Sequence, residues 1–352
     1  MRYQRFLNRL EEEELDGFVV TRPANLEYLF HFRGSVGTAL CRDGETTLLV
    51  DSRYITEARA KARHCSPCLA PKSLHESLHK KLKKACRKSA SPLRIGFESD
   101  FVTHDFVRRA AAWDLPVRWM PASGWIAELR IIKQAEEIQS LKRAFRRAQA
   151  AFAQTMQEVA PGQSEVDIAG RLEWAMRCQG ADSFAFETIV ASGPRSALPH
   201  ARPGMEKWKP AEVLLVDFGL RLEEGYCSDL TRVQLPSRGP SGKIARIVRG
   251  AQQKALEAIR PGVQAAAVDA AARDWIEKHG YGEHFGHGLG HGLGLEVHEP
   301  PSIRPRSEQI LQEGMAFTVE PGIYLPGQFG IRIEDAVVVC KDGFEFLSDP
   351  GQ

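Results

Sequence analysis

The chain has 352 residues, of which 43% are hydrophobic and 26% charged, and its formal net charge is +2. This composition is typical of a globular protein, and the length exceeds what one hydrophobic core usually serves, so we expect two domains. A nearly neutral charge argues against nucleic acid as a partner, and the absence of any apolar run of about 18 residues predicts no membrane span. Seven cysteines and a charged N-terminus favour a reducing cytoplasm over secretion.

The first part of the chain alternates short strands and helices. Apolar runs at residues 17–20 and 94–98 predict strands, and residues 39–50 predict a hairpin that turns at Asp43-Gly44. A lysine-rich helix over residues 74–88 is interpreted as a solvated surface helix. We therefore expect a small α/β domain over residues 1–127.

The pattern changes near residue 128, where we place the start of a second domain, residues 128–352. Apolar residues recur every three or four positions over 138–159, which predicts one long amphipathic helix. A second long helix is predicted over 243–259. Each is followed by Pro-Gly and a further helix, and five features recur about 100 residues apart: Pro161-Gly162, Val166-Asp167, Ala169, Trp174 and Gly180, then Pro261-Gly262, Val268-Asp269, Ala271, Trp275 and Gly280. We interpret this repeat as two halves related by a pseudo-twofold axis.

Carboxylates stand at the ends of the strands predicted in this second domain. The predicted strands cover residues 185–191, 213–219, 226–233, 316–320 and 331–339. Four acidic residues lie in or beside them: Asp217, Asp229, Glu320 and Glu334. Each alone has an ordinary structural explanation, such as a turn or an ion pair. Together they would repel one another strongly unless a cation lay between them.

A glycine- and histidine-rich segment, Phe285–His298, lies between these carboxylates in the sequence. Its glycine density indicates backbone packed closely against a neighbour. Imidazoles close to carboxylates form a ligand set for a divalent transition metal. A nucleotide-binding interpretation of the glycines fails, because no Lys-Ser or Lys-Thr follows them.

These motifs, in this order, resemble the pita-bread metallopeptidases. Within them the chain is most similar to the Xaa-Pro aminopeptidases and Xaa-Pro dipeptidases (prolidases), over nearly its whole length. The resemblance rests on five ordered motifs: Asp217-Phe-Gly, Ser228-Asp229-Leu-Thr-Arg232, Gly290-His291-Gly with Val297-His298-Glu299, Glu320-Pro-Gly-Ile-Tyr324 and Arg332-Ile-Glu334-Asp335. It implies an α/β fold of two domains: a small N-terminal α/β domain and a C-terminal pita-bread domain with a pseudo-twofold repeat.

The resemblance also implies two divalent metal ions, with manganese first and cobalt, zinc or iron as alternatives. Five ligands are implied: Asp217, Asp229, His291, Glu320 and Glu334, with Asp229 and Glu334 bridging the pair. Glu320 would also act as general base. The other implied site residues are His298 at the scissile carbonyl oxygen, His200 against the substrate, His287 lining the pocket or relaying protons, and Tyr324 and Arg332 near the metals. His284 is interpreted as a solvated loop residue.

The implied activity is removal of the N-terminal residue from peptides with proline in second position. The segment from Gly34 to Ala39 favours an aminopeptidase. A strict Xaa-Pro dipeptidase is the alternative, and a methionine aminopeptidase or a metal-free binding protein on the same scaffold fits less well. The resemblance also suggests a homodimer. One departure concerns Asp217 and Asp229, which are twelve positions apart where eleven is expected. We expect the hairpin turn between them to absorb the extra residue.

Overall fold

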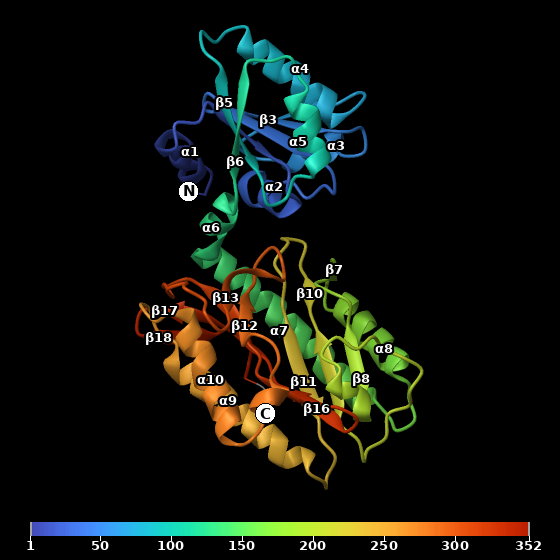
Figure 1. Cartoon of the computed structure of the whole chain (residues 1–352). Helices are drawn as coiled ribbons and strands as arrows, with labels where there is room; N and C mark the ends of the chain where they lie inside the picture. Colours follow the sequence, from blue (N-terminus) through green and yellow to red (C-terminus); the bar gives the residue numbers. More distant parts are fainter. Residues whose placement is uncertain (1, 351–352) are drawn as a thin grey trace. The chain divides into compact units, whose positions relative to one another are not determined.

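The computed structural model describes residues 2–350, which divide into two compact units between Arg130 and Ile131 (Figure 1). The division falls at the end of helix α6 (Trp125–Ile131), which contains the sequence-predicted border at 127/128. Among the described residues no helix is both long and apolar enough to cross a membrane. Each unit has its own hydrophobic core, and each is described by itself below.

Unit 1 is a six-stranded mixed sheet flanked by helices, with strand order β4-β3-β2-β1-β5-β6. Its strands are β1 (Gly17–Val20), β2 (Thr38–Arg42), β3 (Glu45–Val50), β4 (Ser66–Leu69), β5 (Leu93–Glu98) and β6 (Val117–Ala122). Its helices, before α6, are α1 (Arg2–Glu12), α2 (Pro23–Phe30), α3 (Ile55–Lys61), α4 (Leu74–Cys86) and α5 (His104–Ala111).

The predicted elements of unit 1 are present. The hairpin β2–β3 turns at Asp43 and Gly44, which have φ of 52° and 74°, the left-handed pair that a tight hairpin turn requires. Helix α4 buries Leu78 and Leu82 against the sheet and leaves most of its lysines exposed. This arrangement matches the interpretation of the lysine-rich run as a solvated face.

Unit 2 contains two helix pairs and several antiparallel sheets. The first half contains α7 (Ala135–Glu158), α8 (Glu165–Cys178), β7 (Ser183–Phe184), β8 (Ile189–Ser192), the 3-10 turn η1 (Gly193–Ala197), β9 (Leu214–Phe218), β10 (Leu220–Arg221) and β11 (Leu230–Gln234). The second half contains α9 (Ser241–Ala258), α10 (Ala265–Lys278), η2 (Gly282–His284), β12 (Gly290–Gly292), β13 (Glu299–Ile303), β14 (Ala316–Val319), β15 (Gly322–Leu325), β16 (Phe329–Arg332), β17 (Asp335–Cys340) and β18 (Gly343–Phe346).

The two halves repeat one local arrangement at a separation of 100 residues. The amide of Gly162 donates to the carbonyl of Trp208 over 2.9 Å, and the amide of Gly262 donates to that of Leu311 over the same distance. In both halves a long helix, a Pro-Gly turn and a 14-residue helix follow one another. The sequence repeat therefore has a structural counterpart, although Val166-Asp167 and Val268-Asp269 lie two positions out of that register.

Three predicted strands are shorter than the apolar pattern indicates. Residues 185–188 are irregular between β7 and β8, residues 226–229 precede β11, and residues 333–334 separate β16 from β17. In each of the last two gaps a backbone amide bonds outside its own ladder: Cys227 to the Gly294 carbonyl (2.8 Å) and Glu334 to the Thr231 carbonyl (3.2 Å). The hydrophobic pattern alone could not predict where these strands are interrupted, because the backbone amides pair with segments that are distant in the sequence.

Candidate metal centre

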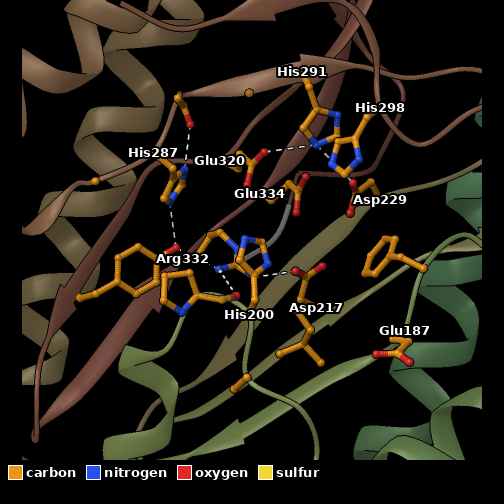
Figure 2. A pocket seen from close by; sticks show the side chains of 18 of the residues that line it. Glu187, His200, Asp217, Asp229, His287, His291, His298, Glu320, Arg332 and Glu334 are labelled. Atoms are coloured by element: carbon orange, nitrogen blue, oxygen red, sulfur yellow. Dashed lines mark hydrogen bonds and ion pairs between the residues drawn. The ribbon is translucent and has the colours of Figure 1, made fainter. Parts of the chain in front are cut away.

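All five predicted metal ligands line one cavity of about 1050 Å³ in unit 2 (Figure 2). Each lies in a strand or within one or two residues of a strand end: Asp217 in β9, Asp229 before β11, His291 in β12, Glu320 after β14 and Glu334 between β16 and β17. The strands belong to different sheets and to both halves of the unit. The fold therefore brings together groups that are up to 117 positions apart in the sequence.

The hairpin β9–β11 directs both aspartates to one side. Asp217 pairs with Thr231 in the antiparallel ladder, and the bridge between Arg221 and Cys227 continues the same register. Asp229 precedes Thr231 by two positions, so its side chain leaves the same face as that of Asp217. A short turn ending at Gly225, with φ of 83°, closes the hairpin and accommodates the extra residue between the aspartates.

Glycines on both sides of His291 allow three strands to pack closely. A Cβ on Gly290 would lie 1.9 Å from the Thr318 carbonyl oxygen, and one on Gly292 would lie 2.2 Å from the Pro300 carbonyl oxygen. Any other residue at these positions would force β12 away from β13 and β14. The close backbone packing expected from the glycine density is therefore present here.

The imidazole of His291 presents one nitrogen to the carboxylates. Its Nδ1 lies 3.1 Å from the Gly292 carbonyl oxygen, which can only accept, so Nδ1 carries the hydrogen. Nε2 then has a free lone pair, 3.5 Å from Asp229 Oδ2 and 3.3 Å from Glu320 Oε1. A hydrogen-bonded Nδ1 with a bare Nε2 is the usual state of a metal-binding histidine.

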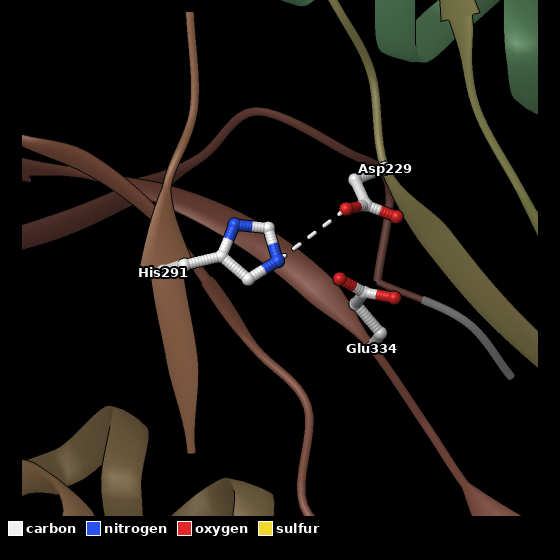
Figure 3. Close-up of side chains that lie close together, drawn as sticks. All are labelled: Asp229, His291 and Glu334. Carbon is white, nitrogen blue, oxygen red and sulfur yellow. Dashed lines mark ion pairs between the residues drawn. The ribbon is translucent and has the colours of Figure 1, made fainter. Parts of the chain in front are cut away.

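Three of the five residues form a tight group (Figure 3). Asp229, His291 and Glu334 each offer a ligand atom, and these atoms lie within 4.8 Å of one another. In addition, Asp217 Oδ1 and Glu334 Oε1 are buried and accept no hydrogen bond from the described residues. Buried carboxylate oxygens normally have a donor, so two oxygens without one fit a site that holds a cation.

The electrostatics of the group agree with this interpretation. Burial, followed by the charges of neighbouring carboxylates, raises the pKa of Asp229 and of Glu334 well above the ordinary range. Burial raises the pKa of Glu320 to about 7 and lowers the pKa of His291 to about 4. The site thus concentrates acidic groups where they repel one another, and divalent cations would relieve that repulsion. The donor set and the orphaned oxygens fit such ions.

Arg332 and Tyr324 support the ligands from behind. Arg332 Nη2 donates to Asp217 Oδ2 over 2.5 Å, and Nη1 donates to the Tyr324 hydroxyl over 2.9 Å. Arg332 Nε donates to Thr231 Oγ1 (2.9 Å), which in turn donates to Glu334 Oε2 (2.8 Å). One guanidinium therefore fixes two carboxylates, one directly and one through a threonine.

The three other predicted pocket histidines differ in their surroundings. His287 is held at both ring nitrogens, by the Gly288 carbonyl (2.8 Å) and by the Tyr324 hydroxyl (2.9 Å). The ring of His298 contacts that of His291, with centroids 4.3 Å apart, and lines the cavity. His200 lines the cavity from the first half of the unit (Figure 2). His284, interpreted as solvated, is half-buried and lines the same cavity.

Two supporting ion pairs were not anticipated from the sequence. Asp269 pairs with Arg273 on α10, and together they bond to the Leu289 amide and the His287 carbonyl. Glu165 at the start of α8 pairs with Arg195 and bonds to the loop that carries His200. In the sequence, Asp269 and Arg273 look like an ordinary surface pair four residues apart on a helix. Glu165 looks like an acid that favours the first turn of a helix. Nothing in the sequence therefore marked these residues as supports of the site.

Comparison with known proteins establishes the family. Residues 139–341 match the model of metallopeptidase family M24, and residues 2–132 match the creatinase/prolidase N-terminal domain. The chain is 36% identical to the uncharacterized peptidase YqhT of Bacillus subtilis, over 97% of this chain and 96% of that one. It is 33% identical to an Xaa-Pro dipeptidase of Pyrococcus furiosus, covering 99% and 97%. It also resembles the crystal structure of an X-Pro aminopeptidase from Thermotoga maritima, with a TM-score of 0.92, 35% identity and coverage of 99% and 98%.

The chain is therefore a member of metallopeptidase family M24. The chain has the fold of this family, with a creatinase/prolidase N-terminal domain, and its similarity to the named relatives extends over nearly the whole chain. It is therefore an enzyme of the Xaa-Pro aminopeptidase and dipeptidase type. Membership implies divalent metal ions. The recognition made from the sequence motifs and the two-domain α/β fold are confirmed.

Proposed function

We propose that this protein is a dinuclear metal-dependent Xaa-Pro aminopeptidase that uses the five-residue site. The observation that carries the proposal is the convergence of four carboxylates, three of them buried and one partly buried, and one bare imidazole nitrogen on one cavity. Two of the carboxylate oxygens accept no hydrogen bond from the described residues. Asp217, Asp229, His291, Glu320 and Glu334 would hold two divalent ions, with manganese first among the candidates. When bound, the ions would supply an acidified water and polarise the scissile carbonyl.

Glu320 is suited to proton transfer. It lies at the end of β14 against His291, and Thr318 Oγ1 donates to its Oε1 over 3.2 Å. Its carboxylate would take a proton from the attacking water and deliver it to the proline nitrogen as the peptide bond breaks. This delivery is essential, because the leaving nitrogen must gain one proton to depart as an amine.

His298 and His200 are proposed to contact the substrate. Burial lowers the pKa of His298, so the ring is neutral near pH 7 and can donate a hydrogen bond to the carbonyl oxygen as negative charge develops there. His200 enters from the opposite half of the unit. Both nitrogens of His287 are already engaged, which supports a lining role for this ring, holding Tyr324, in place of proton relay.

The cavity favours substrates longer than a dipeptide. Its volume of about 1050 Å³ lies at the upper end of small-molecule pockets. A dipeptide carries its carboxylate next to the scissile bond and needs a nearby cation. Among the described lysines and arginines lining the cavity, only Arg332 is buried, and Asp217 and Tyr324 occupy it. Arg202 and Arg304 are exposed, where an ion pair contributes little.

The same two exposed arginines keep an Xaa-Pro dipeptidase as the second candidate. Both arginines line the cavity. Arg202 Nε lies 3.6 Å from Glu187 Oε2, and Arg304 belongs to the second half of the unit. Either could read a free carboxylate once a substrate displaces water. Arg202→Ala and Arg304→Ala variants separate the candidates. In a dipeptidase, at least one of them should raise the KM for a dipeptide several-fold and barely change the KM for a longer peptide.

The test is hydrolysis of Ala-Pro, Ala-Pro-Ala and a pentapeptide beginning Ala-Pro, after chelation and after manganese is restored. Metal-dependent cleavage with kcat/KM rising from the dipeptide to the longer peptides supports the aminopeptidase. Cleavage of Ala-Pro alone supports the dipeptidase. Failure to cleave any of the three, in a protein shown to bind metal, overturns both candidates and leaves a different substrate or a binding role.

We further propose a homodimer, as the family resemblance suggests, with proline-containing peptides as the substrate partner. Light scattering coupled to gel filtration measures the mass directly. A mass of twice 39.2 kDa supports the proposal, and a mass of one chain contradicts it.

A further inference from the structure

The loop that carries His200 is fastened at both ends to one buried carboxylate. Glu165, the first residue of α8, is fully buried. Its Oε1 accepts from the Ser192 amide (2.7 Å) and the Ser192 hydroxyl (3.0 Å), and its Oε2 accepts from the Gly204 amide (2.9 Å). These two residues bracket the loop of residues 193–203, which lines the cavity from Pro199 to Pro203. A single side chain thus joins the two ends of the loop, beside backbone bonds from the Val166 amide to the Gly204 carbonyl (3.1 Å) and from the Gly193 amide to the Val213 carbonyl (2.8 Å).

The charge of Glu165 is balanced inside the same loop. Arg195 Nε lies 3.2 Å from one carboxylate oxygen and 3.0 Å from the other. Arg195 Nη2 also donates to the carbonyl of Arg202, on the far side of the loop. Carboxylate and guanidinium therefore cross-link the loop as a unit, with hydrogen bonds of the stronger, charge-assisted kind.

The middle of the loop is fastened to the strands that support the metal site. The Gly330 amide donates to Ser196 Oγ over 2.9 Å, and Arg332 Nη1 donates to the Pro199 carbonyl over 3.3 Å. The Pro199 carbonyl is one residue before His200. The position of the imidazole thus depends on Arg332 at one side and on the Glu165 closure at the two ends.

We propose that Glu165 is a positioning residue that sets the place of His200 against the bound peptide. This inference rests on the proposed function, because it assumes that His200 contacts the substrate. Without the closure the loop would pay the entropy of ordering its residues each time a peptide binds. With it, the imidazole is already in place.

The variant that tests the proposal is Glu165→Gln, which keeps the size but removes the charge and presents an NH₂ group to a backbone amide. We expect faster amide hydrogen exchange over residues 193–204 and unchanged metal content. We also expect kcat/KM for a cleaved Xaa-Pro peptide to fall by about 10- to 100-fold, mainly through KM, as displacement of a positioning group does. Combined with His200→Ala, the fall should be no larger than that of His200→Ala alone.

Asp167→Asn is the matched control. Asp167 lies two residues further along the same helix turn and, among the residues that the structure describes, accepts from Ser164 alone, as part of the helix cap. Its loss should lower the melting temperature without changing exchange over residues 193–204, and kcat/KM should stay within about twofold. A helix-start effect would therefore appear in both variants, and a loop effect only in Glu165→Gln.

Two results would overturn the proposal: normal exchange and kcat/KM in Glu165→Gln, or a double variant in which the two losses multiply. If Glu165→Gln does not fold, Glu165→Asp keeps the charge but is too short to reach both loop ends. It should show the same exchange and kinetic changes at smaller size, and wild-type behaviour there would also overturn the proposal. A wild-type protein inactive on every Xaa-Pro peptide would instead refute the proposed function, and the exchange experiment would still report on the closure.

Discussion

Buried carboxylates in the two units differ in how their oxygens are satisfied. In unit 1, Glu98 is 3% exposed, and its oxygens accept from the amides of Thr21 and Arg22 and from the side-chain amide of Asn25. In unit 2, Asp217 and Glu334 are also buried, at 8% and 2% exposed, yet each has one oxygen that accepts no hydrogen bond from the described residues. Burial raises the pKa in both places. The two places differ in whether every carboxylate oxygen receives a hydrogen bond.

This difference separates a structural acid from a ligand. Glu98 replaces water with four protein donors and so holds the turn between β1 and α2. The acids of unit 2 receive a few donors that orient them, from Arg332, Thr231 and Thr318, and leave the remaining lone pairs directed at one another. Such a group is stable only with a cation or with protons.

The largest expected effect is on Asp229 and Glu334, the two proposed bridging ligands. In Asp229→Asn or Glu334→Gln the charge of a proposed ligand is lost, so metal affinity should fall by more than the roughly 10- to 100-fold that loss of an outer support costs. Activity should be abolished. Elemental analysis after dialysis and a peptide assay measure both, and full metal occupancy in either variant would contradict the ligand assignment.

His298→Ala should leave the metal content intact but lower kcat. The ring is proposed to donate to the developing oxyanion, and removing one such donor costs about 100- to 1000-fold in kcat. Steady-state kinetics beside metal analysis distinguish this from ligand loss. Near-normal turnover would refute the carbonyl role, and a loss of metal would make His298 a ligand.

Metal affinity should fall as the pH falls. Burial raises the pKa of Glu320 from 4.5 to about 7 in the metal-free protein, so between these values the folded protein holds a proton that the unfolded chain does not. The stability from this proton is fully present below pH 4.5 and is lost as pH rises through 7. A bound cation displaces the proton, so affinity should drop about tenfold per pH unit below 7 for each proton released.

Two titrations measure this coupling between metal binding and proton release. Calorimetry with manganese in buffers of different ionisation enthalpy counts the protons released near pH 6. Thermal unfolding with and without manganese should show a gain in melting temperature that grows from pH 5 to pH 8. A gain independent of pH would show that no carboxylate proton is displaced.

The smallest effect on function is expected in unit 1. Glu98→Gln puts an NH₂ group among backbone donors, so the free energy of unfolding should fall by about 1–3 kcal/mol. Metal content and kcat/KM should not change, since Glu98 has no unmatched oxygen for a cation. Urea unfolding and elemental analysis test this, and a variant that lost metal would break the distinction between the two kinds of acid.

The site was predictable from the sequence to the extent that its residues interrupt a pattern. Asp217 ends an apolar strand, and His291 stands between glycines whose missing side chains let β12 approach its neighbours, so both stood out. The strand break at Glu334 did not, because its amide bonds to Thr231 of another sheet. Such long-range pairing leaves no local signal.

The supporting residues were hidden for a similar reason. Glu165 and Asp269 are acids near helix starts, which the helix dipole favours whatever lies beyond them. Only the fold shows that Glu165 reaches Gly204 and that Asp269 reaches Leu289. Motif resemblance supplied the predicted ligands and Arg332, which orients two of them, but neither Glu165 nor Asp269.

The most direct test of the two-metal account is the number of manganese ions that the chelated protein binds at saturation, measured by equilibrium dialysis with elemental analysis. The account predicts two ions per chain, and loss of binding in Glu334→Gln but not in Glu98→Gln. Binding of fewer than two ions per chain, with cobalt, zinc and iron tried as well as manganese, would contradict the account. Binding of none would also leave the carboxylate oxygens of Asp217 and Glu334 that lack a described donor in need of another explanation.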